Sequence, residues 1–357
     1  MNNQPTVSSP LLELRQVSLV YGKTRVVDSI DLSIGENELV CLLGPSGCGK
    51  TSTLRIASGV ERQTSGAVFF QGREISGPKH HAPPEARQIG LMFQDFALFP
   101  HMSVLANVGF GLKALDRAAR RERSMAALER MGMAHLAEAY PHMLSGGEQQ
   151  RVALCRALAP DPKIMLMDEP FSGLDRGLRN AVRDETRQML ASAGASGLLV
   201  THDAEEAMGI ADRIVLMRKG KFVQIGSPRE IYDHPVDLES AELFSEINKL
   251  EGIVEGGSFM SEIGSFDVNG AQPRTKADIA LRYSDFRLQE PSDKPSYQFK
   301  VTIRSVRFLG RDCQIEFQGP NGGQILRARL PDTTSLAAGE HTELYFPKDK
   351  VLIFERK

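Results

Sequence analysis

Residues 39–51 read LVCLLGPSGCGKT and decide the fold of this 357-residue chain. The first five residues are an uncharged apolar run that predicts one buried strand, because the run is too short for a helix. The next eight residues fit the phosphate-loop pattern G-x-x-x-x-G-K-[ST]. Glycines let backbone N–H groups converge on an anion, and a helix expected from about residue 49 adds its positive N-terminal end. The stretch therefore predicts binding of a nucleoside triphosphate.

Individual loop positions have expected roles. Lys50 can reach the β- and γ-phosphates, and the Thr51 hydroxyl can hold Mg²⁺. The alternative is a plain glycine-rich turn, which the strand before it and the helix after it disfavour. The residues expected to contact the nucleotide here are Gly44, Pro45, Ser46, Gly47, Cys48, Gly49, Lys50, Thr51 and Ser52.

Composition limits the class of protein. The length allows two or three domains, and 41% apolar residues are enough for a well-buried core. A formal net charge of −2 gives no reason to expect nucleic acid as a partner. Four cysteines without paired spacing indicate reduced, cytosolic thiols. Residues 1–10 do not resemble a signal peptide, and without an apolar run of 18 residues a membrane part would have to come from another chain.

The segments around the phosphate loop predict further strands. Residues 11–34 indicate two strands joined by a turn at 21–23. Tyr21 ends the first strand, where an adenine could stack on it; the alternative is an ordinary tyrosine at a strand end. His80 and His81 lie in a loop and are interpreted as solvent-exposed, because no third metal ligand is near.

The middle of the chain contains a further strand and then a helical pattern. Residues 88–94 predict a buried strand that ends at Gln94. Leu105, Val108 and Leu112 are expected to share one helix face, and Met125, Leu128 and Met131 another. The nearby arginines are interpreted as the solvated side of the second helix, and they are Arg117, Arg120, Arg121 and Arg123.

Residues 144–151, LSGGEQQR, predict a second anion site. Ser145 has the residue type of a helix N-cap. Gly146 and Gly147 leave backbone N–H groups uncovered at the start of the following helix.

Two later strands end in polar residues. Residues 163–170 end a buried strand at Asp168 and Glu169; Asp168 is placed to hold Mg²⁺ through water, and Glu169 to orient or deprotonate the attacking water. Paired acids at a strand end are otherwise loop caps. Residues 197–203 end a strand at His202, which can donate a hydrogen bond to a γ-phosphate.

Strands and helices alternate up to about residue 230, which indicates an α/β class with a mostly parallel sheet. A helix is expected to start after Ser172–Asp175, and 213–226 predicts a hairpin. Residues 236–250 indicate a helical link. From about residue 299 apolar residues alternate with period two, which predicts a small all-β barrel or sandwich of about a hundred residues.

In this order and spacing, the phosphate loop, Gln94, LSGGEQQR, LMDEP, SGLD and VTHD resemble the nucleotide-binding subunits of ABC transporters. The resemblance implies a P-loop ABC ATPase core over 11–240, with a helical subdomain at about 95–160. Residues 245–357 resemble the OB-like regulatory β-barrel of importer ATPases for sugars, polyamines, sulfate and ferric iron. Its landmark is IALRYSDFRL, in which Tyr283 replaces a usual proline.

The resemblance also implies a mechanism. Two copies pair head to tail, so that the Ser145 loop of one, with Gly146, Gly147 and Gln149, closes over ATP held at Lys50 of the other. The implied roles are an adenine platform for Tyr21, a switch touching Mg²⁺ and the attacking water for Gln94, the catalytic base for Glu169 and a γ-phosphate sensor for His202. The implied Mg²⁺ residues are Thr51, Gln94 and Asp168.

The implied partners are transmembrane permease subunits, a second copy of the chain and, indirectly, an external solute-binding protein. The protein is then peripheral, at the cytoplasmic face of the plasma membrane. Residues 94–112 and 233–248 look most like ferric-iron importers. Residues 95–102 are unusually apolar and predict a groove for a permease helix anchored by Phe96, Leu98 and Phe99; the alternative is internal packing.

Other functions remain to be weighed. A soluble ABC ATPase of chromosome maintenance needs a long coiled coil between phosphate loop and LSGG, yet about ninety residues separate Lys50 from Ser145. The translation type carries two cassettes in one chain. A third alternative is a regulator whose barrel senses a ligand or protein.

Overall fold

A computed structural model describes residues 10–174, 176–261, 263–267, 275–292, 294–319, 322–332 and 335–356. Asp175, expected at a helix start, lies outside the described residues. The chain divides into two compact units, and the boundary in the sequence falls between Ile231 and Tyr232. Residues 232–240, expected at the end of the first domain, therefore cluster with the second unit. Nowhere in the described ranges is a helix both long and apolar enough to span a bilayer.

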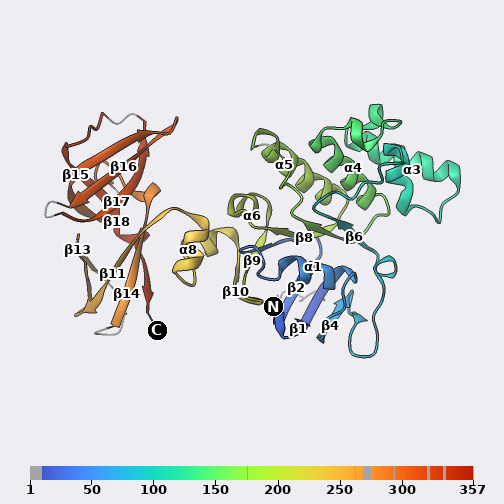
Figure 1. The fold of residues 1–357 in the computed structure, drawn as a ribbon, viewed down its shortest axis with the longest axis horizontal. Coiled ribbons are helices and arrows are strands. Elements are labelled where there is room, and N and C mark those ends of the chain that lie inside the picture. Colours follow the sequence, from blue (N-terminus) through green and yellow to red (C-terminus); the bar gives the residue numbers. More distant parts are fainter. Residues whose placement is uncertain are drawn as a thin grey trace, which may run out of the picture. The chain divides into compact units, whose positions relative to one another are not determined.

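The first unit is built on a six-stranded sheet that confirms the mostly parallel layer (Figure 1). Its central strands are parallel. The hairpin predicted over 213–226 is confirmed, and it turns at Lys219 and Gly220, which both have positive φ. In sheet order, the strands are β10 Lys221–Gly226, β9 Arg213–Arg218, β3 Leu39–Leu43, β8 Ser196–Thr201, β7 Ile164–Asp168 and β6 Ile89–Met92. The carboxyl ends of parallel strands meet at one edge, which is where such sheets bind ligands.

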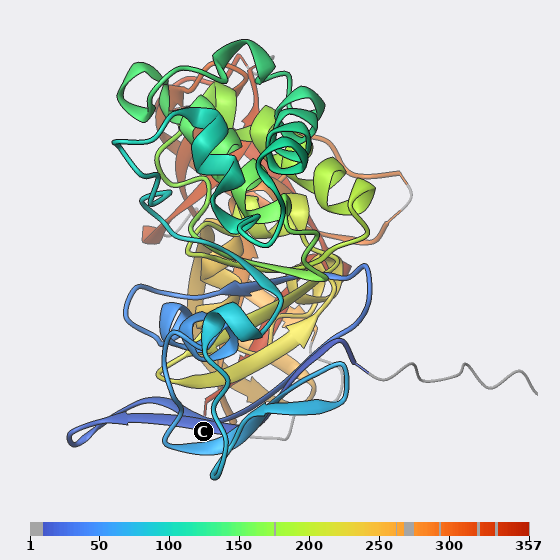
Figure 2. The same cartoon turned by 90° about the vertical axis from the view of Figure 1, so that its right-hand side faces the viewer.

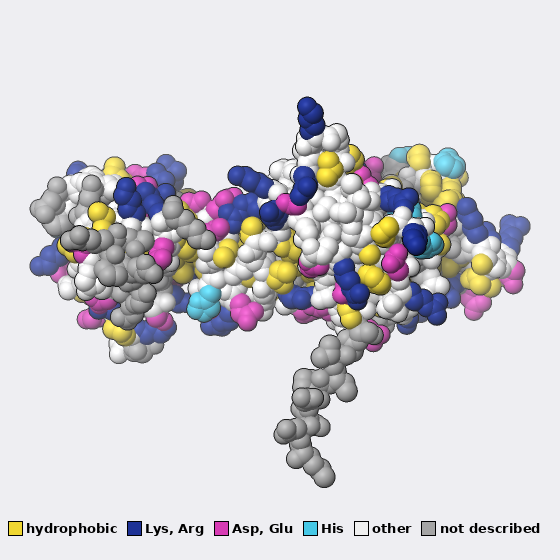
Figure 3. Space-filling view, turned by 90° about the horizontal axis from the view of Figure 1, so that it is seen from below, with side chains coloured by type: hydrophobic (Ala, Val, Ile, Leu, Met, Phe, Trp, Pro, Cys, Tyr) yellow, Lys and Arg dark blue, Asp and Glu magenta, His cyan; other side chains and the backbone are white. Residues whose placement is uncertain are grey.

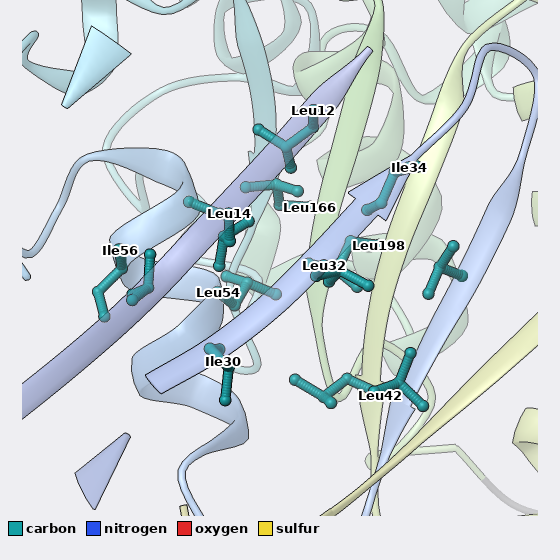
Figure 4. Packing of buried hydrophobic residues seen from close by; sticks show 14 of the residues in the cluster. Leu12, Leu14, Ile30, Leu32, Ile34, Leu42, Leu54, Ile56, Leu166 and Leu198 are labelled. Carbon is teal, nitrogen blue, oxygen red and sulfur yellow. The ribbon is translucent and has the colours of Figure 1, made fainter. Parts of the chain in front are cut away.

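A second, antiparallel sheet packs against this layer. It consists of β2 Thr24–Ile34, β1 Leu12–Tyr21, β4 Ser65–Phe70 and β5 Arg73–Ser76. Helix α1, Lys50–Ser58, contributes Leu54 and Ile56 to a core that also contains Leu14, Leu42 and Leu166 (Figure 4). Each fully buried aliphatic side chain contributes about 1.5–3 kcal/mol. The core therefore fixes the helix whose first residue is Lys50.

The helical subdomain has a core of its own. It contains α2 Val104–Val108, α3 Arg117–Arg130 and α4 Gly146–Leu158. Figure 2 shows these green and teal helices at one end of the unit and the blue antiparallel strands at the other. Further helices of the unit are α5 Arg176–Ser192, α6 Ala204–Ile210 and α7 Pro228–Asp233, which runs into the second unit.

Three expectations for this region need correction. The helix with Leu105 and Val108 ends at Val108 and continues as a 3₁₀ turn, although Leu112 is still buried. Arg120 and Arg123 are not on a solvated face: both are half-buried and donate to backbone carbonyl groups. The strand expected over 88–94 covers only Ile89–Met92, because β6 is an edge strand that pairs with β7 alone.

The second unit contains helix α8, Leu238–Phe244, and two antiparallel sheets around one core, which confirms the predicted all-β domain. The five-stranded sheet is β13 Gly264–Asp267, β12 Ser258–Ser261, β11 Ile247–Glu255, β14 Thr275–Arg282 and β19 Leu352–Glu355. The four-stranded sheet is β17 Gly322–Pro331, β16 Asp312–Gly319, β15 Ser296–Phe308 and β18 His341–Pro347. The helical link expected over 236–250 is wrong at its end, because residues from Ile247 pair with β14.

Asn248 joins these two sheets. It is 5% exposed, its Nδ2 donates to the carbonyl of Arg327 at 2.7 Å, and its Oδ1 accepts the Arg327 N–H at 2.8 Å. One side chain on β11 thus satisfies both backbone groups of a residue on edge strand β17, as a neighbouring strand would.

Candidate functional site

The phosphate loop is shaped by positions that only glycine can fill. Gly47 and Gly49 have φ of 79° and 112°, in the left-handed region. A Cβ at Gly49 would lie 2.5 Å from the Val26 carbonyl oxygen, and one at Gly44 would lie 2.1 Å from that of Met217. The backbone of strands β2 and β9 therefore lies directly against one side of the loop. An anion would meet the N–H groups of the loop from the opposite side.

Lys50 lies inside this loop. Its side chain is buried, with only 6% of the residue exposed, and Nζ donates to the carbonyl oxygens of Gly44 at 2.7 Å and Pro45 at 3.1 Å. Cys48 is 5% exposed, and burial raises the pKa of its thiol. The loop therefore holds one cation and a neutral thiol, which suits an incoming polyphosphate.

Thr51 and Asp168 meet next to the loop. The Thr51 hydroxyl donates to Asp168 Oδ1 at 3.1 Å, which joins the start of α1 to the end of β7. Asp168 is 7% exposed, and burial raises the pKa of its carboxyl group. A bound cation would reverse this effect.

Glu169 is the centre of a second cluster. It directly follows β7, and its φ of 43° is unusual for a residue with a side chain. Gln94 Nε2 donates to Glu169 Oε2 at 3.3 Å, and His202 Nδ1 lies 3.1 Å from Glu169 Oε1. The turn after β6 and the end of β8 thus bring two predicted site residues, Gln94 and His202, to the Glu169 carboxylate at the end of β7.

The residues at this edge fit Mg²⁺. The Thr51 hydroxyl, the Asp168 carboxylate and the Gln94 amide offer the hard oxygen ligands that this ion prefers. No group of three or more His, Cys, Asp or Glu residues able to hold a metal is found in the described ranges. Substrate phosphates and water would complete the coordination of an ion held here. His81 is half-buried against Ser76 and the Gly59 carbonyl group, so the solvent-exposed interpretation was wrong for it.

Tyr21 ends β1 and is 50% exposed. Its hydroxyl group hydrogen-bonds Glu61, which raises the pKa of the phenol. The ring therefore has a fixed edge and an accessible surface, as an adenine platform requires.

The LSGG loop forms a capped helix start. Ser145 is the N-cap of α4: its Oγ accepts the Glu148 N–H at 3.4 Å, while Glu148 Oε2 accepts the Ser145 N–H at 2.8 Å. The predicted N-cap is confirmed. Glu148 is a residue that the sequence reasoning missed, although Ser-x-x-Glu before an apolar run is the sequence signature of a capping box.

The glycines of this loop are not required by the chain's own packing. A Cβ at Gly147 would meet nothing within 4 Å, and one at Gly146 would meet only the Gly173 carbonyl oxygen at 3.9 Å. Gln149, by contrast, is occupied locally, since its Nε2 donates to the carbonyl oxygens of Pro141 and Leu144. The uncovered glycines leave room for something from outside the chain.

The two anion-binding starts belong to different parts of the first unit. Helix α1 packs against β7 and β8, whereas α4 packs against α2 and α3 (Figures 1 and 2). The structure therefore brings together residues of the phosphate loop, Gln94, Asp168, Glu169 and His202, but not the Ser145 loop.

Known proteins show similarity to both units. The family described as ABC transporter matches residues 27–172, and the TOBE domain family matches residues 279–354. The chain is 44% identical over 336 residues to the putrescine transport ATP-binding protein PotG of Escherichia coli, which covers 90% of this chain and 88% of that protein. It is 36% identical over 322 residues to the Fe(3+) ions import ATP-binding protein FbpC 2 of Haemophilus influenzae, covering 88% and 90%.

A solved structure supports the same assignment for the first unit. The ATP-binding cassette MJ0796, in a dimeric post-hydrolysis state bound to ADP and Pi, superimposes with a TM-score of 0.56 at 29% identity, covering 61% of this chain and 99% of that chain. These matches confirm the expected family, fold class and ATPase activity. They do not single out ferric iron, because a sulfate/thiosulfate import protein of Photorhabdus laumondii is also 44% identical, over 255 residues that cover 70% of this chain and 69% of that protein. The chain therefore belongs to the ATP-binding proteins of ABC transporters that carry a C-terminal TOBE domain, a family of import ATPases.

Proposed function

We propose that two copies of this chain pair head to tail and hydrolyse ATP to energise solute import through membrane permease subunits. The observation that supports the pairing is the start of α4 at Gly146 and Gly147. Among the described residues, nothing packs closely against these two glycines. In the pair, this helix start closes over the triphosphate held at Lys50 of the other copy. The dimeric state of the MJ0796 cassette supports pairing of two copies.

The chemistry follows from the carboxylate of Glu169. This group accepts a proton from the attacking water, and its contacts with Gln94 and His202 fix its direction. Lys50 balances charge on the β- and γ-phosphates, and the Tyr21 ring stacks on the base. Thr51, Asp168 and Gln94 would hold Mg²⁺, which would neutralise charge on the transferring phosphoryl group.

For the cargo we infer a small solute delivered by an external binding protein to a permease, with this chain at the cytoplasmic face of the membrane. Relatives named for putrescine or spermidine/putrescine import span 80–90% of this chain at 36–44% identity. This similarity favours a polyamine over the ferric iron that residues 94–112 suggest. Sulfate and sugars are the remaining alternatives.

Glu169→Gln tests the ATPase mechanism. The amide cannot accept the proton, so turnover should fall at least ~100-fold while MgATP binding persists. The ATP-bound head-to-tail pair should then accumulate, which gel filtration with and without MgATP detects. Glu85→Gln, an exposed change away from the site, is the matched control. Near-normal turnover of Glu169→Gln would remove Glu169 from the role of base.

The transport role needs a separate measurement. The chain should co-purify from native membranes with permease subunits, and the reconstituted complex should hydrolyse ATP faster when binding protein loaded with its solute is added. Stimulation by putrescine, but not by Fe³⁺ or sulfate, would support the polyamine assignment. ATP hydrolysis that no membrane partner binds to or stimulates would favour a soluble regulatory ATPase.

A further inference from the structure

Arg156, on the helix that starts at the LSGG loop, holds the segment that follows Gln94. Its Nη1 donates to the carbonyl oxygen of Ala97 at 2.6 Å, and its Nη2 donates to that of Phe96 at 2.7 Å. The guanidinium also lies over the Phe99 ring, 5.5 Å from its centroid. One side chain of α4 thus contacts three residues of a segment about sixty positions earlier in the chain.

The backbone at these two carbonyl groups is strained. Phe96 and Ala97 have φ of 58° and 46°, so two consecutive residues with side chains occupy the left-handed region. In this region the Cβ atom crowds the following carbonyl oxygen, so each such residue is strained. Arg156 binds the two carbonyl groups through two separate nitrogens of a planar, rigid guanidinium. A lysine has one nitrogen on a flexible stem and cannot reproduce this fork. The strained conformation is maintained by this contact.

The positively charged guanidinium of Arg156 is hydrogen-bonded to backbone carbonyl oxygens. The side chain is half-buried, and burial lowers its pKa, with Asp95 the nearby acid that opposes this shift. In the described part of the chain Arg156 forms no ion pair with a carboxylate. A buried guanidinium is costly unless its hydrogen-bonding groups are satisfied, so these two hydrogen bonds are its main compensation.

A second residue fastens the other end of the same segment. Asn107 on α2 is fully buried; its Oδ1 accepts the Phe99 N–H at 2.9 Å, and its Nδ2 donates to the Phe99 and Met102 carbonyl oxygens at 3.1 Å. The segment from Phe96 to Met102 is therefore attached at both ends to the helical subdomain. Gln94, two residues before it, instead contacts Glu169 at the edge of the sheet.

We propose that Arg156 is a positioning residue that makes Gln94 follow the movements of α4. Ser145 begins this helix, and Arg156 lies eleven residues further along, about 16 Å by the rise of an α-helix. When the Ser145 loop engages ATP on the other copy, α4 transmits the displacement through Arg156 to the strained turn and so to Gln94. The inference rests on the role proposed above for Gln94.

A double-mutant cycle tests this link. Arg156→Lys keeps the charge but loses the fork, so kcat for ATP hydrolysis should fall about tenfold, while KM stays within about twofold because the phosphate loop is untouched. In a Gln94→Ala background the same change should lower kcat by less than twofold, since Arg156 acts through Gln94. The matched control is Arg120→Lys, because Arg120 also donates to two carbonyl oxygens, those of Lys113 and Leu115, but does not contact the segment.

A readout independent of turnover completes the test. Amide hydrogen exchange over residues 95–99 should change on adding MgATP in the wild type and in Arg120→Lys, but not in Arg156→Lys. Equal kcat losses with and without Gln94, or a response of exchange to MgATP in Arg156→Lys as large as in the wild type, would show that Arg156 is only a packing residue. Failure of the wild type to hydrolyse ATP would instead overturn the proposed function.

Discussion

At the scale of single residues, the site is defined by side chains that the fold holds under constraint. Glu169 adopts φ of 43° directly after a fully buried strand, and its N–H donates to the Val200 carbonyl oxygen at 2.9 Å. Such backbone strain costs about 1–3 kcal/mol and persists where the surroundings enforce it. The strain turns the carboxylate toward Gln94 and His202 and away from the path of the strand.

Cys48 reports on the phosphate loop. Because Cys48 belongs to the phosphate loop, a bulky alkyl group on its thiol should abolish ATP binding. MgATP bound beforehand should protect the thiol from alkylation. Burial raises the pKa of Cys48, so the thiolate is scarce near neutral pH and alkylation should accelerate as pH rises. Mass spectrometry of the labelled peptide, paired with an ATP-binding assay, measures both effects.

The other cysteines serve as internal controls. Burial raises the pKa of Cys155 to about 12, and all four cysteines are buried and outside any disulfide. Cys155 and Cys313 should show no comparable protection by nucleotide. Full ATP binding after confirmed modification of Cys48 would contradict its placement in the nest.

At the scale of elements, the segment 95–102 is the predicted docking site for a permease helix. Phe96, Leu98 and Phe99 are half-buried, and the Phe99 ring packs 4.3 Å from Phe110, which is itself 38% exposed. The segment thus packs internally and also presents apolar surface. Internal packing therefore describes part of the segment, and the groove for a permease helix stays a prediction.

Phe99→Ala should weaken permease association by roughly thirtyfold or more, because aromatic hot spots contribute at least ~2 kcal/mol. ATP affinity of the isolated subunit should be nearly unchanged. Co-purification and ATP binding are measured on one preparation, with Val60→Ala, another exposed apolar position, as control. Parallel losses of both activities would assign the segment to the core.

The elements also show what the sequence could and could not predict. The buried strand at 39–43 and the helix from Lys50 follow from an apolar run and a glycine pattern that act locally. The end of β6, the short α2 and the start of β11 were missed, because they depend on partners distant in the chain. The role of Arg156 could not be predicted from the sequence, because only the folded chain brings its guanidinium to Phe96.

At the scale of the whole molecule, the chain combines two compact units with separate hydrophobic cores in one polypeptide. Basic and acidic side chains intermingle over the face seen in Figure 3, which agrees with a formal net charge of −2. That face gives a polyanion no continuous basic surface. The predicted catalytic residues all lie in the first unit. The second unit has a hydrophobic core of its own.

Asn248→Ala should destabilise the second unit alone. Removing the amide leaves the Arg327 N–H and carbonyl groups without their partner, which costs about 1–3 kcal/mol. Calorimetry should therefore show two unfolding transitions, of which the mutation lowers one and MgATP raises the other. A single transition that responds to both would mean that the two cores unfold as one.

The separation of Lys50 from Ser145 within one chain has a genetic consequence. If each composite site takes its phosphate loop from one copy and its LSGG loop from the other, Lys50→Ala and Ser145→Arg chains should each be inactive alone. Mixed together, they form heterodimers in which one of the two sites contains both loops intact. Activity should reappear on mixing, and either defective chain in excess over wild type should act as a dominant inhibitor.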